Sequence, residues 1–342
     1  MEIHRLGQRK VVLPKRPFVA SGAAIAVKKE GEGPLGSEFD AVIEDDLFDE
    51  ETWEKAESRF AYTAATTCLT KAGCTSGRVE AVLGGDLINQ IIPTSMAARE
   101  LHAPFLGLYG ACSTMAEGLC VAAMLVDGGY VRNALCVAGS HFCSAERQYR
   151  FPLEYGSQRT PTSQWTVTGA GAVFLTLEDG FPRLARITHL TVGQVVDLGV
   201  KDANNMGAAM APAAADTLTR HLQDLHRTAA DYDLIVTGDL GRLGHEVVTD
   251  LFTRDGVDMT KNYKDCGLLL YDLERQDMHM GGSGCGCSAA VLNGYLLRGM
   301  REGKWNRIVF APTGALLSPT SSWQGESIPG ICHAVAITAE GR

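Results

Sequence analysis

Residues 81–87 read Ala-Val-Leu-Gly-Gly-Asp-Leu, and residues 234–240 read Leu-Ile-Val-Thr-Gly-Asp-Leu. Each stretch is a short apolar run that ends in a glycine–aspartate turn, which is typical of a buried strand in an α/β sheet. A second echo pairs the turn at Cys112 with the turn at Cys285, and each turn precedes a helix and then a strand. The repetition predicts two similar α/β halves packed together. We place these halves at residues 1–180 and 181–342.

Around the first copy, apolar strands alternate with amphipathic helices. This alternation predicts βαβ units, with helices on both faces of a parallel sheet. Residues 170–177 and 184–192 alternate in polarity like antiparallel strands, and we expect them near the joint between the halves. The expected helices are 52–69, a helix ending at Arg99, and 114–126, and the expected buried strands are 81–84, 104–108 and 135–139.

Composition narrows the class of protein. The chain has 342 residues, of which 45% are hydrophobic and 21% charged, as in an ordinary soluble globular protein. Its net charge of −9 argues against a nucleic-acid binder and against adsorption to an anionic lipid surface. The best apolar stretch, 115–126, is too short to span a bilayer and contains Glu117. No secretory signal is expected, so contact with a membrane would require another protein.

The ten cysteines are too sparse and irregular for a disulfide scaffold, which points to a reducing compartment. Cys68, Cys120 and Cys136 lie in apolar or helical runs and are expected to pack as small hydrophobic residues. Cys112 differs, because it follows an apolar strand at the start of a helix. The helix N-terminus would lower the pKa of its thiol, and the free amides there, beginning at Ser113, could hold an oxyanion or a carboxylate. The alternative is a buried structural cysteine.

The second half offers weaker candidates. Cys285 and Cys287 lie in a glycine-rich turn, but Cys-x-Cys is not zinc-finger spacing and no metal site is expected. His141 and His333 follow or precede strands and could face a central site, although a histidine there is more often a satisfied core residue. Asp86 and Asp239 are the mirrored turn carboxylates, and their simplest role is to cap the helices that follow.

One basic and aromatic run stands out in this acidic chain. It contains Arg147, Arg150 and Arg159. The guanidinium group suits carboxylate binding. The alternative is a solvated loop with ion pairs to Glu146 and Glu154.

Taken together, the repeated halves and the Cys112 turn resemble the thiolase superfamily. Within it, the chain is most similar to the stage V sporulation protein AD family of spore-forming bacteria, and the similarity extends over essentially the whole chain. The matching runs are Gly33–Gly36, Gly85–Leu87, Phe105, Gly110–Thr114, Ala145–Gln148, Glu154–Gly156, Thr166–Gly169, Met210–Asp216, Gly281–Cys285 and Thr313–Thr320.

The resemblance implies a five-layer αβαβα fold, a homodimer, and a site where the helices of both halves meet. Thiolases and ketoacyl synthases use a cysteine at the position that matches Cys112, together with His and Asn or His and a second Cys from the other half. This chain has Cys285 at one matching turn and neither His nor Asn at the Gly238-Asp239 turn, which leaves His333 as the nearby imidazole. Loss of such partners costs about 3 kcal/mol of barrier per oxyanion donor, so we do not expect an enzyme.

The sporulation family implies a binding protein for dipicolinate (pyridine-2,6-dicarboxylate) that supports its uptake into the developing spore. Expected partners are membrane proteins of the same operon, which would hold the chain peripherally at the inner spore membrane. No cofactor is expected, although calcium could accompany the ligand. The alternatives are an active condensing enzyme or thioesterase that uses Cys112, and a scaffold with a vestigial pocket. The expected ligand-binding residues are Asp86, Cys112, Ser113, His141, Arg147, Asp239, Cys285 and His333.

Overall fold

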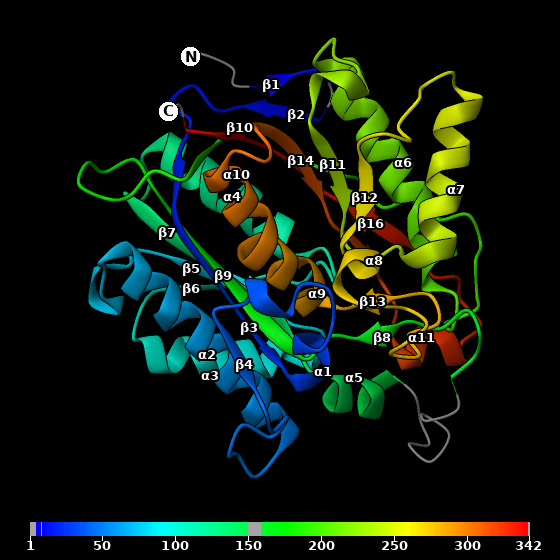
Figure 1. Ribbon diagram of the computed structural model, residues 1–342, viewed down its shortest axis with the longest axis horizontal. Helices are drawn as coiled ribbons and strands as arrows, with labels where there is room; N and C mark the ends of the chain where they lie inside the picture. The colour runs from blue at the N-terminus through cyan, green and yellow to red at the C-terminus, as the bar shows by residue number, and fades with distance from the viewer. Residues whose placement is uncertain (1–4, 8, 150–158, 341–342) are drawn as a thin grey trace.

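A computed structural model describes residues 5–7, 9–149 and 159–340 of the chain (Figure 1). Its main sheet runs in the order β12-β11-β14-β17-β10-β3-β9-β7-β5-β6. The strands from the first part of the chain are β3 (Phe18–Val27), β5 (Val82–Gly85), β6 (Phe105–Gly107), β7 (Asn133–Ser140) and β9 (Gly169–Thr176). Those from the second part are β10 (Ala185–Thr191), β11 (Leu234–Thr237), β12 (Tyr263–Asp265), β14 (Arg307–Ala311) and β17 (Ala334–Ala339).

The two sets of strands have the same topology. In the first set, β5 pairs in parallel with both β6 and β7, and β9 lies antiparallel between β7 and β3. In the second set, β11 pairs in parallel with both β12 and β14, and β17 lies antiparallel between β14 and β10. The duplication predicted from the glycine–aspartate turns is therefore present in strand order and direction.

Helices form three layers around these strands. The outer layers are α2 and α3 on one side and α6 and α7 on the other, while α4 and the helix that begins with α9 lie between the halves (Figure 1). The apolar core follows the same division, with a central cluster and two outer clusters. The result is the five-layer αβαβα arrangement. The helices are α2 (Trp53–Ala72), α3 (Ile92–Leu101), α4 (Thr114–Gly128), α6 (Met206–Asp224), α7 (Gly241–Arg254), α9 (Cys285–Ala290), the π-helical η6 (Val291–Leu296) and α10 (Leu297–Glu302).

The sequence of α2 accounts for its boundaries. Thr52 precedes the helix and its hydroxyl accepts a hydrogen bond from the Lys55 amide at 3.3 Å. The helix ends at Gly73, whose φ of 69° is the left-handed conformation that glycine adopts without strain. Phe60 and Cys68, at helical spacing, are fully buried against the sheet. The helix predicted over 52–69 is confirmed, with one further turn.

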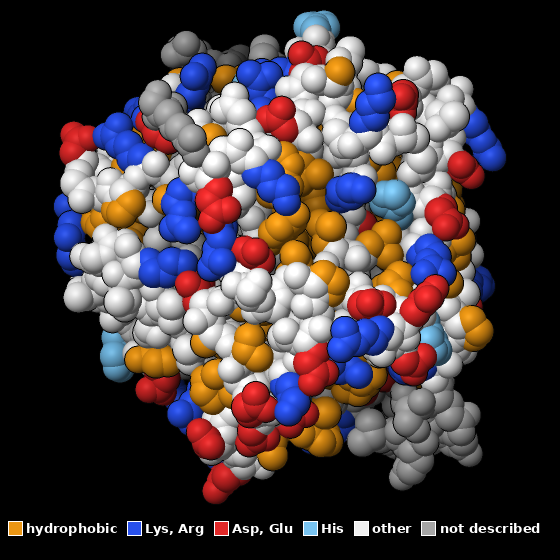
Figure 2. Space-filling model, viewed as in Figure 1, with side chains coloured by type: hydrophobic (Ala, Val, Ile, Leu, Met, Phe, Trp, Pro, Cys, Tyr) orange, Lys and Arg blue, Asp and Glu red, His pale blue; other side chains and the backbone are white. Residues whose placement is uncertain are grey.

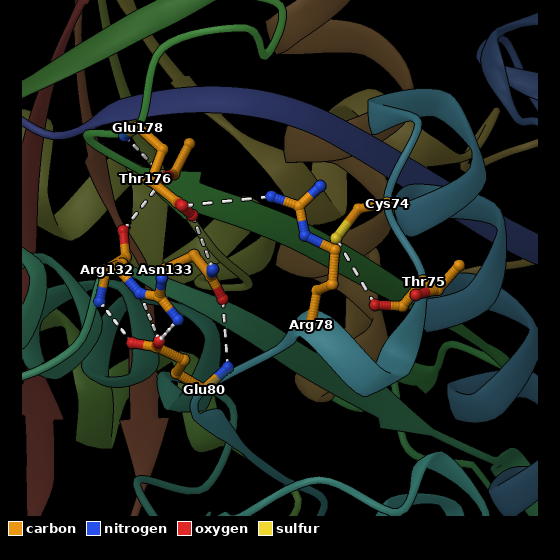
Figure 3. A network of polar contacts seen from close by, with 8 residues as sticks. All are labelled: Cys74, Thr75, Arg78, Glu80, Arg132, Asn133, Thr176 and Glu178. Carbon is orange, nitrogen blue, oxygen red and sulfur yellow. Dashed lines mark hydrogen bonds and ion pairs between the residues drawn. The ribbon is translucent and has the colours of Figure 1, made fainter.

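A polar network fixes the sheet of the first half at the end remote from Cys112 (Figure 3). Asn133 at the start of β7 accepts from the Glu80 amide at 3.1 Å and donates to Glu178 at 2.9 Å. Glu80 also accepts the backbone amide of Arg132 at 2.7 Å. These bonds join the starts of β5 and β7 to the end of β9. They fix the register of the three strands at the end of the sheet opposite Cys112.

Short elements surround the region where the halves meet. Two small sheets lie there: β8 pairs with β13, and β15 pairs with β16. These short elements are β8 (Trp165–Thr166), β13 (Gly282–Ser283), β15 (Thr313–Ala315), β16 (Gly330–Cys332), α5 (Phe142–Tyr149), α8 (Cys266–Leu270) and α11 (Pro319–Trp323). The remaining elements are β1 (Arg5–Leu6), β2 (Lys10–Val12), α1 (Lys28–Gly31), η1 (Gly36–Glu38), β4 (Ala41–Ile43), η2 (Ser76–Arg78), η3 (Asn89–Ile91) and η5 (Ala229–Asp231).

Most expected elements of the first half are confirmed within a few residues, including the antiparallel strands β9 and β10 near the joint, each of which pairs with β3 between them. One expectation is wrong: the strand at 104–108 is not buried, because β6 is the edge of the sheet and Leu106 is 49% exposed. The division at residues 180 and 181 falls between β9 and β10 and stays a prediction as a domain boundary. Arg150 and residues 154–156 lie outside the described part of the chain.

Candidate functional site

The turn before α4 is held by its own side chains. Ser113 donates to the Gly110 carbonyl at 2.7 Å, and Thr114 donates to the Ala111 carbonyl at 2.7 Å. Ala111 has a φ of 49°, an uncommon conformation for a residue with a side chain. Gly110 is required because a Cβ there would lie 2.6 Å from the Ser113 hydroxyl. Cys112 therefore sits on a rigid turn, and the hydroxyl of Ser113 serves that turn.

The second half closes over this turn. The thiol of Cys285 donates to the Ala111 carbonyl at 3.0 Å, and the hydroxyl of Ser288 contacts the Cys112 carbonyl at 3.5 Å. Ser283 places its hydroxyl 4.0 Å from the Cys112 sulfur. Cys285 and Ser288 belong to α9 and Ser283 to β13, so the segment that echoes the Cys112 turn lies directly against it. Cys112 is 5% exposed.

Asp239 holds the turn before α9 and lies beside Cys112 instead of capping a helix. Its carboxylate accepts from the Ser283 hydroxyl at 3.0 Å, the Gly284 amide at 3.1 Å and the Thr313 hydroxyl at 3.1 Å. The expected cap of α7 is provided by Asp265, which accepts from the Leu240 amide at 2.9 Å. Burial raises the pKa of Asp239 to about 7 despite these bonds. The carboxyl thus titrates near neutrality beside Cys112.

Cys112 is not an activated thiolate. Burial raises its pKa well above the ordinary value, and the negative charge of Asp239 raises it further. This corrects the expectation that the helix N-terminus would lower the pKa of the thiol. One amide bond, from Gly284, acts in the lowering direction and is outweighed.

Asp86 has the capping role that its position suggested. It accepts from the amide and hydroxyl of Thr94 at 2.9 and 2.6 Å, and from the Ile88 amide at 2.8 Å. Burial raises its pKa to about 6. The mirrored aspartates therefore differ: Asp86 caps the helix that follows it, whereas Asp239 binds a later turn of its own half and faces Cys112 of the other half.

Neither predicted histidine brings a charge to the site. His141 accepts from the Cys143 amide at 3.1 Å and contacts the Asp46 carbonyl at 2.9 Å, so both ring nitrogens are used by the backbone. His333 accepts from the Gly193 amide at 3.2 Å, and burial lowers its pKa to about 4. It is neutral at physiological pH and adds no positive charge for a dianion.

The predicted arginines have other partners. Arg147, on α5, pairs with Glu54 and lies over the Trp53 ring at 5.3 Å. Arg159 pairs with Asp277 and lies over the Trp165 ring at 5.2 Å. The ion-pair interpretation of this run is supported, although these partners differ from the expected Glu146 and Glu154.

Sequence reasoning missed Ser283 and Thr313, the hydroxyl donors to Asp239. Both lie in runs that the sequence already singled out, Gly281–Cys285 and Thr313–Thr320. Gln164 was also missed; its amide donates to the Asp239 carbonyl at 2.6 Å and fixes the aspartate turn. Hydroxyl and amide donors are common in loops, so their types alone do not mark them.

The described residues contain no group of three or more His, Cys, Asp or Glu side chains placed to hold a metal ion. Within the same residues, the window Ala111–Gly128 is the one helix long and apolar enough to cross a bilayer, but it is the central helix of the core and 72% of it is buried.

Comparison with known proteins agrees with the five-layer fold. Solved structures similar to the chain include a variant of Xanthomonas campestris OleA (TM-score 0.62, 16% identity, 99% of both chains covered) and human mitochondrial 3-ketoacyl-CoA thiolase in complex with CoA (TM-score 0.60, 14% identity, 96% of this chain and 99% of that chain). These likenesses establish the thiolase fold. Stage V sporulation protein AD of Bacillus subtilis (strain 168) is 45% identical over 335 residues, covering 98% of both chains. The family model described as Stage V sporulation protein AD (SpoVAD) matches residues 7–338, and the chain belongs to this sporulation protein family.

Proposed function

We propose that this chain binds dipicolinate at the Cys112 turn and supports its uptake into the developing spore without acyl chemistry. The contact between Cys285 and Ala111 is the observation that supports the absence of acyl chemistry. A thiol engaged with a backbone carbonyl occupies the position where a condensing enzyme of this fold would place a base. The sporulation family and the resemblance supply the ligand.

The charges of the site bear on how a dianion would bind. The amides of Ser113 and Thr114 donate to the Gly110 and Ala111 carbonyls, so they are not the free donors expected from the sequence. The dipole of α4 still favours a carboxylate at its N-terminus, but Asp239 opposes it unless protonated. Its pKa of about 7 allows protonation at little cost near neutrality. Calcium bound to dipicolinate would reduce the repulsion in another way. We therefore propose that the ligand enters either with Asp239 protonated or as its calcium chelate.

Calorimetric titration tests the proposal directly. Dipicolinate, with and without calcium, is compared with pyridine-3,5-dicarboxylate, which has the same charge but cannot place both carboxylates beside the ring nitrogen. Acetyl-CoA serves as a control for enzyme-like binding. We expect saturable binding of dipicolinate only. Equal binding of the 3,5-isomer would show a non-specific anion site, and no binding would contradict the proposal.

An active cysteine enzyme is the second candidate, and one observation favours it. Asp239 has a pKa near neutrality and could accept a proton in the vicinity of the thiol. Incubation with acetyl-CoA or an acyl-carrier thioester, followed by intact-protein mass spectrometry, decides between the two. Acylation of Cys112 with turnover would establish the enzyme.

We also propose a homodimer formed through the free edge of β6. This strand ends the main sheet, and Leu106 and Tyr109 are 49% and 43% exposed beside it. Unpaired backbone groups at such an edge favour pairing with another strand. Light scattering should give twice the chain mass, and Leu106→Lys should give the monomer. A monomeric wild type would contradict this assignment.

Association with the inner spore membrane is proposed to depend on protein partners. The face in Figure 2 intersperses basic with acidic side chains, and the whole chain carries a net charge of −9. Neither property favours an anionic bilayer. Purified protein should not float with anionic liposomes at low salt; strong flotation would contradict partner dependence.

A further inference from the structure

A segment beside the small β15–β16 sheet has the geometry of an unfilled strand edge. Val196 and Gly330 exchange both backbone hydrogen bonds, at 2.9 and 2.8 Å, in an antiparallel bridge. Because β15 occupies the other side of β16, residues 194–198 lie along the outer side of this two-stranded sheet, joined to it at the Val196–Gly330 bridge. We call these residues the edge segment.

The backbone of the edge segment points outward at alternate positions. In an antiparallel pair, the residues on either side of a hydrogen-bonded pair direct their N–H and C=O groups away from the partner. Val195 and Asp197 occupy these positions. Within the described part of the chain, their backbone groups have no hydrogen-bond partner. The donors and acceptors that a further strand would need are therefore presented to solvent.

The surface around the edge segment is apolar and held in place. Val195 is 55% exposed, Leu198 73% and Trp323 of the neighbouring α11 74%. Ser327 donates to Asp197 at 2.5 Å, and Lys201 donates to the Gly325 carbonyl at 2.7 Å. The apolar side chains therefore stand on segments fixed to each other, and exposure of large apolar groups on such a surface is typical of an interaction site.

The charges select the kind of partner. Asp197, Asp202 and Glu326 are exposed on the segments that form this surface, where Lys201 is the exposed basic residue among 194–202 and 323–327, so the rim is acidic. A second copy of this chain would bring the same acidic groups against these. A basic segment would instead be attracted. Cytoplasmic loops of membrane proteins carry an excess of lysine and arginine, and are one source of such a segment.

We infer that the edge segment binds an extended segment of a different protein, apolar and basic at alternate positions, as an added β-strand. Backbone hydrogen bonds to Val195 and Asp197 would give affinity, and the side chains of Leu198 and Trp323 would contact the apolar positions. This inference does not depend on the Cys112 site, so ligand binding and docking succeed or fail separately.

Peptide binding tests the inference with defined probes. The first is a fluorescent peptide of alternating valine and lysine with blocked ends; the second is the same peptide N-methylated on alternate residues, which removes backbone donors; the third has glutamate in place of lysine. We expect fluorescence anisotropy to show binding of the first peptide, with the other two at least about tenfold weaker. Equal binding of the methylated peptide, or no binding of the first, would overturn the inference.

Variants of the protein provide the matched control. Val195→Pro removes the outward N–H and leaves the Val196–Gly330 bridge in place, whereas Val195→Thr keeps the N–H and the branched shape. We expect the proline variant to lose peptide binding and the threonine variant to keep it, with dipicolinate titration unchanged in both. Unchanged peptide binding by Val195→Pro overturns the inference. So does a loss of oligomer mass in that variant alone, because the edge would then pair with a second copy.

Discussion

The thiol of Cys285 donates a hydrogen bond to the carbonyl of Ala111 at 3.0 Å, so the first turn of α9 is bonded to the turn that carries Cys112. Two echoed segments of the chain thus meet at one point, each contributing a cysteine. Cys285 binds the backbone there, and Cys112 faces Ser283 and the Asp239 carboxyl.

Replacing Asp239 by asparagine should activate Cys112. The amide keeps an oxygen for Ser283 and Gly284 but removes the negative charge that raises the pKa of the thiol. We expect alkylation by iodoacetamide at about pH 8 to accelerate at least about tenfold. Peptide mass spectrometry measures Cys112 against Cys143, whose pKa is raised by burial and then by Asp46 and Glu146, and not by Asp239.

In the wild type, Cys112 should still react with iodoacetamide before Cys68 and Cys120. Cys112 is 5% exposed, whereas Cys68 is 0% and Cys120 3% exposed. Cys112 also lies in a turn, whereas the other two lie within helices. If Cys112 reacts no faster than these two in the wild type, and Asp239→Asn leaves its rate unchanged, Cys112 is a packing residue.

Substitutions at Cys112 should separate binding from chemistry. Cys112→Ser preserves the turn and the backbone amides, so dipicolinate affinity should fall by no more than about threefold. Cys112→Trp places a bulky ring at this buried position before α4 and should abolish both binding and spore loading. Titration and spore dipicolinate content measure the two effects. Normal loading by the tryptophan variant would place the ligand elsewhere.

The sequence predicted the fold well because its evidence was local. Apolar runs that end in Gly-Asp, and the placement of a cysteine before each central helix, reveal the strands and their duplication. The site was predicted less well because burial decides the behaviour of its groups. Asp239 and Asp86 occupy the same place in the repeat, yet Asp239 holds the turn at Gly284 beside Cys112, and Asp86 caps α3. The neutral state of His333 depends on how deeply the chain buries it. Neither property is encoded in residue spacing.

Dipicolinate affinity should depend on pH through Asp239. An anion binds best when this carboxyl is protonated, so affinity should fall as pH rises through about 7. Asp239→Asn should bind more tightly than the wild type at about pH 8 and show a flatter profile. Titration across about pH 6 to 8, with calcium removed by chelation, checks the slope. A wild-type profile as flat as that of the variant would show that Asp239 does not face the ligand.

Glu30 should make the stability of the fold depend on pH. It is fully buried and accepts from the Thr168 amide at 3.1 Å and the Tyr271 hydroxyl at 2.5 Å, joining segments from both halves. Its second carboxylate oxygen is buried without a hydrogen-bond partner, and burial raises its pKa from 4.5 to about 7. Between these values the unfolded chain releases a proton that the folded chain retains. Stability therefore falls as pH rises from 4.5 to about 7 and stays lower above it.

The size of this effect is at most about 3 kcal/mol, from the pKa difference. Glu30→Gln keeps an oxygen for Thr168 and Tyr271 but cannot ionise, so its unfolding free energy should change less between about pH 5 and pH 8 than that of the wild type. Urea unfolding at the two pH values measures the difference, and Glu44→Gln, whose side chain is 79% exposed, provides the control. Other buried carboxyls, including Asp86 and Asp239, titrate in the same range, so the informative quantity is the change in slope between variant and wild type. An identical slope in Glu30→Gln would mean that Glu30 is already ionised in the folded protein.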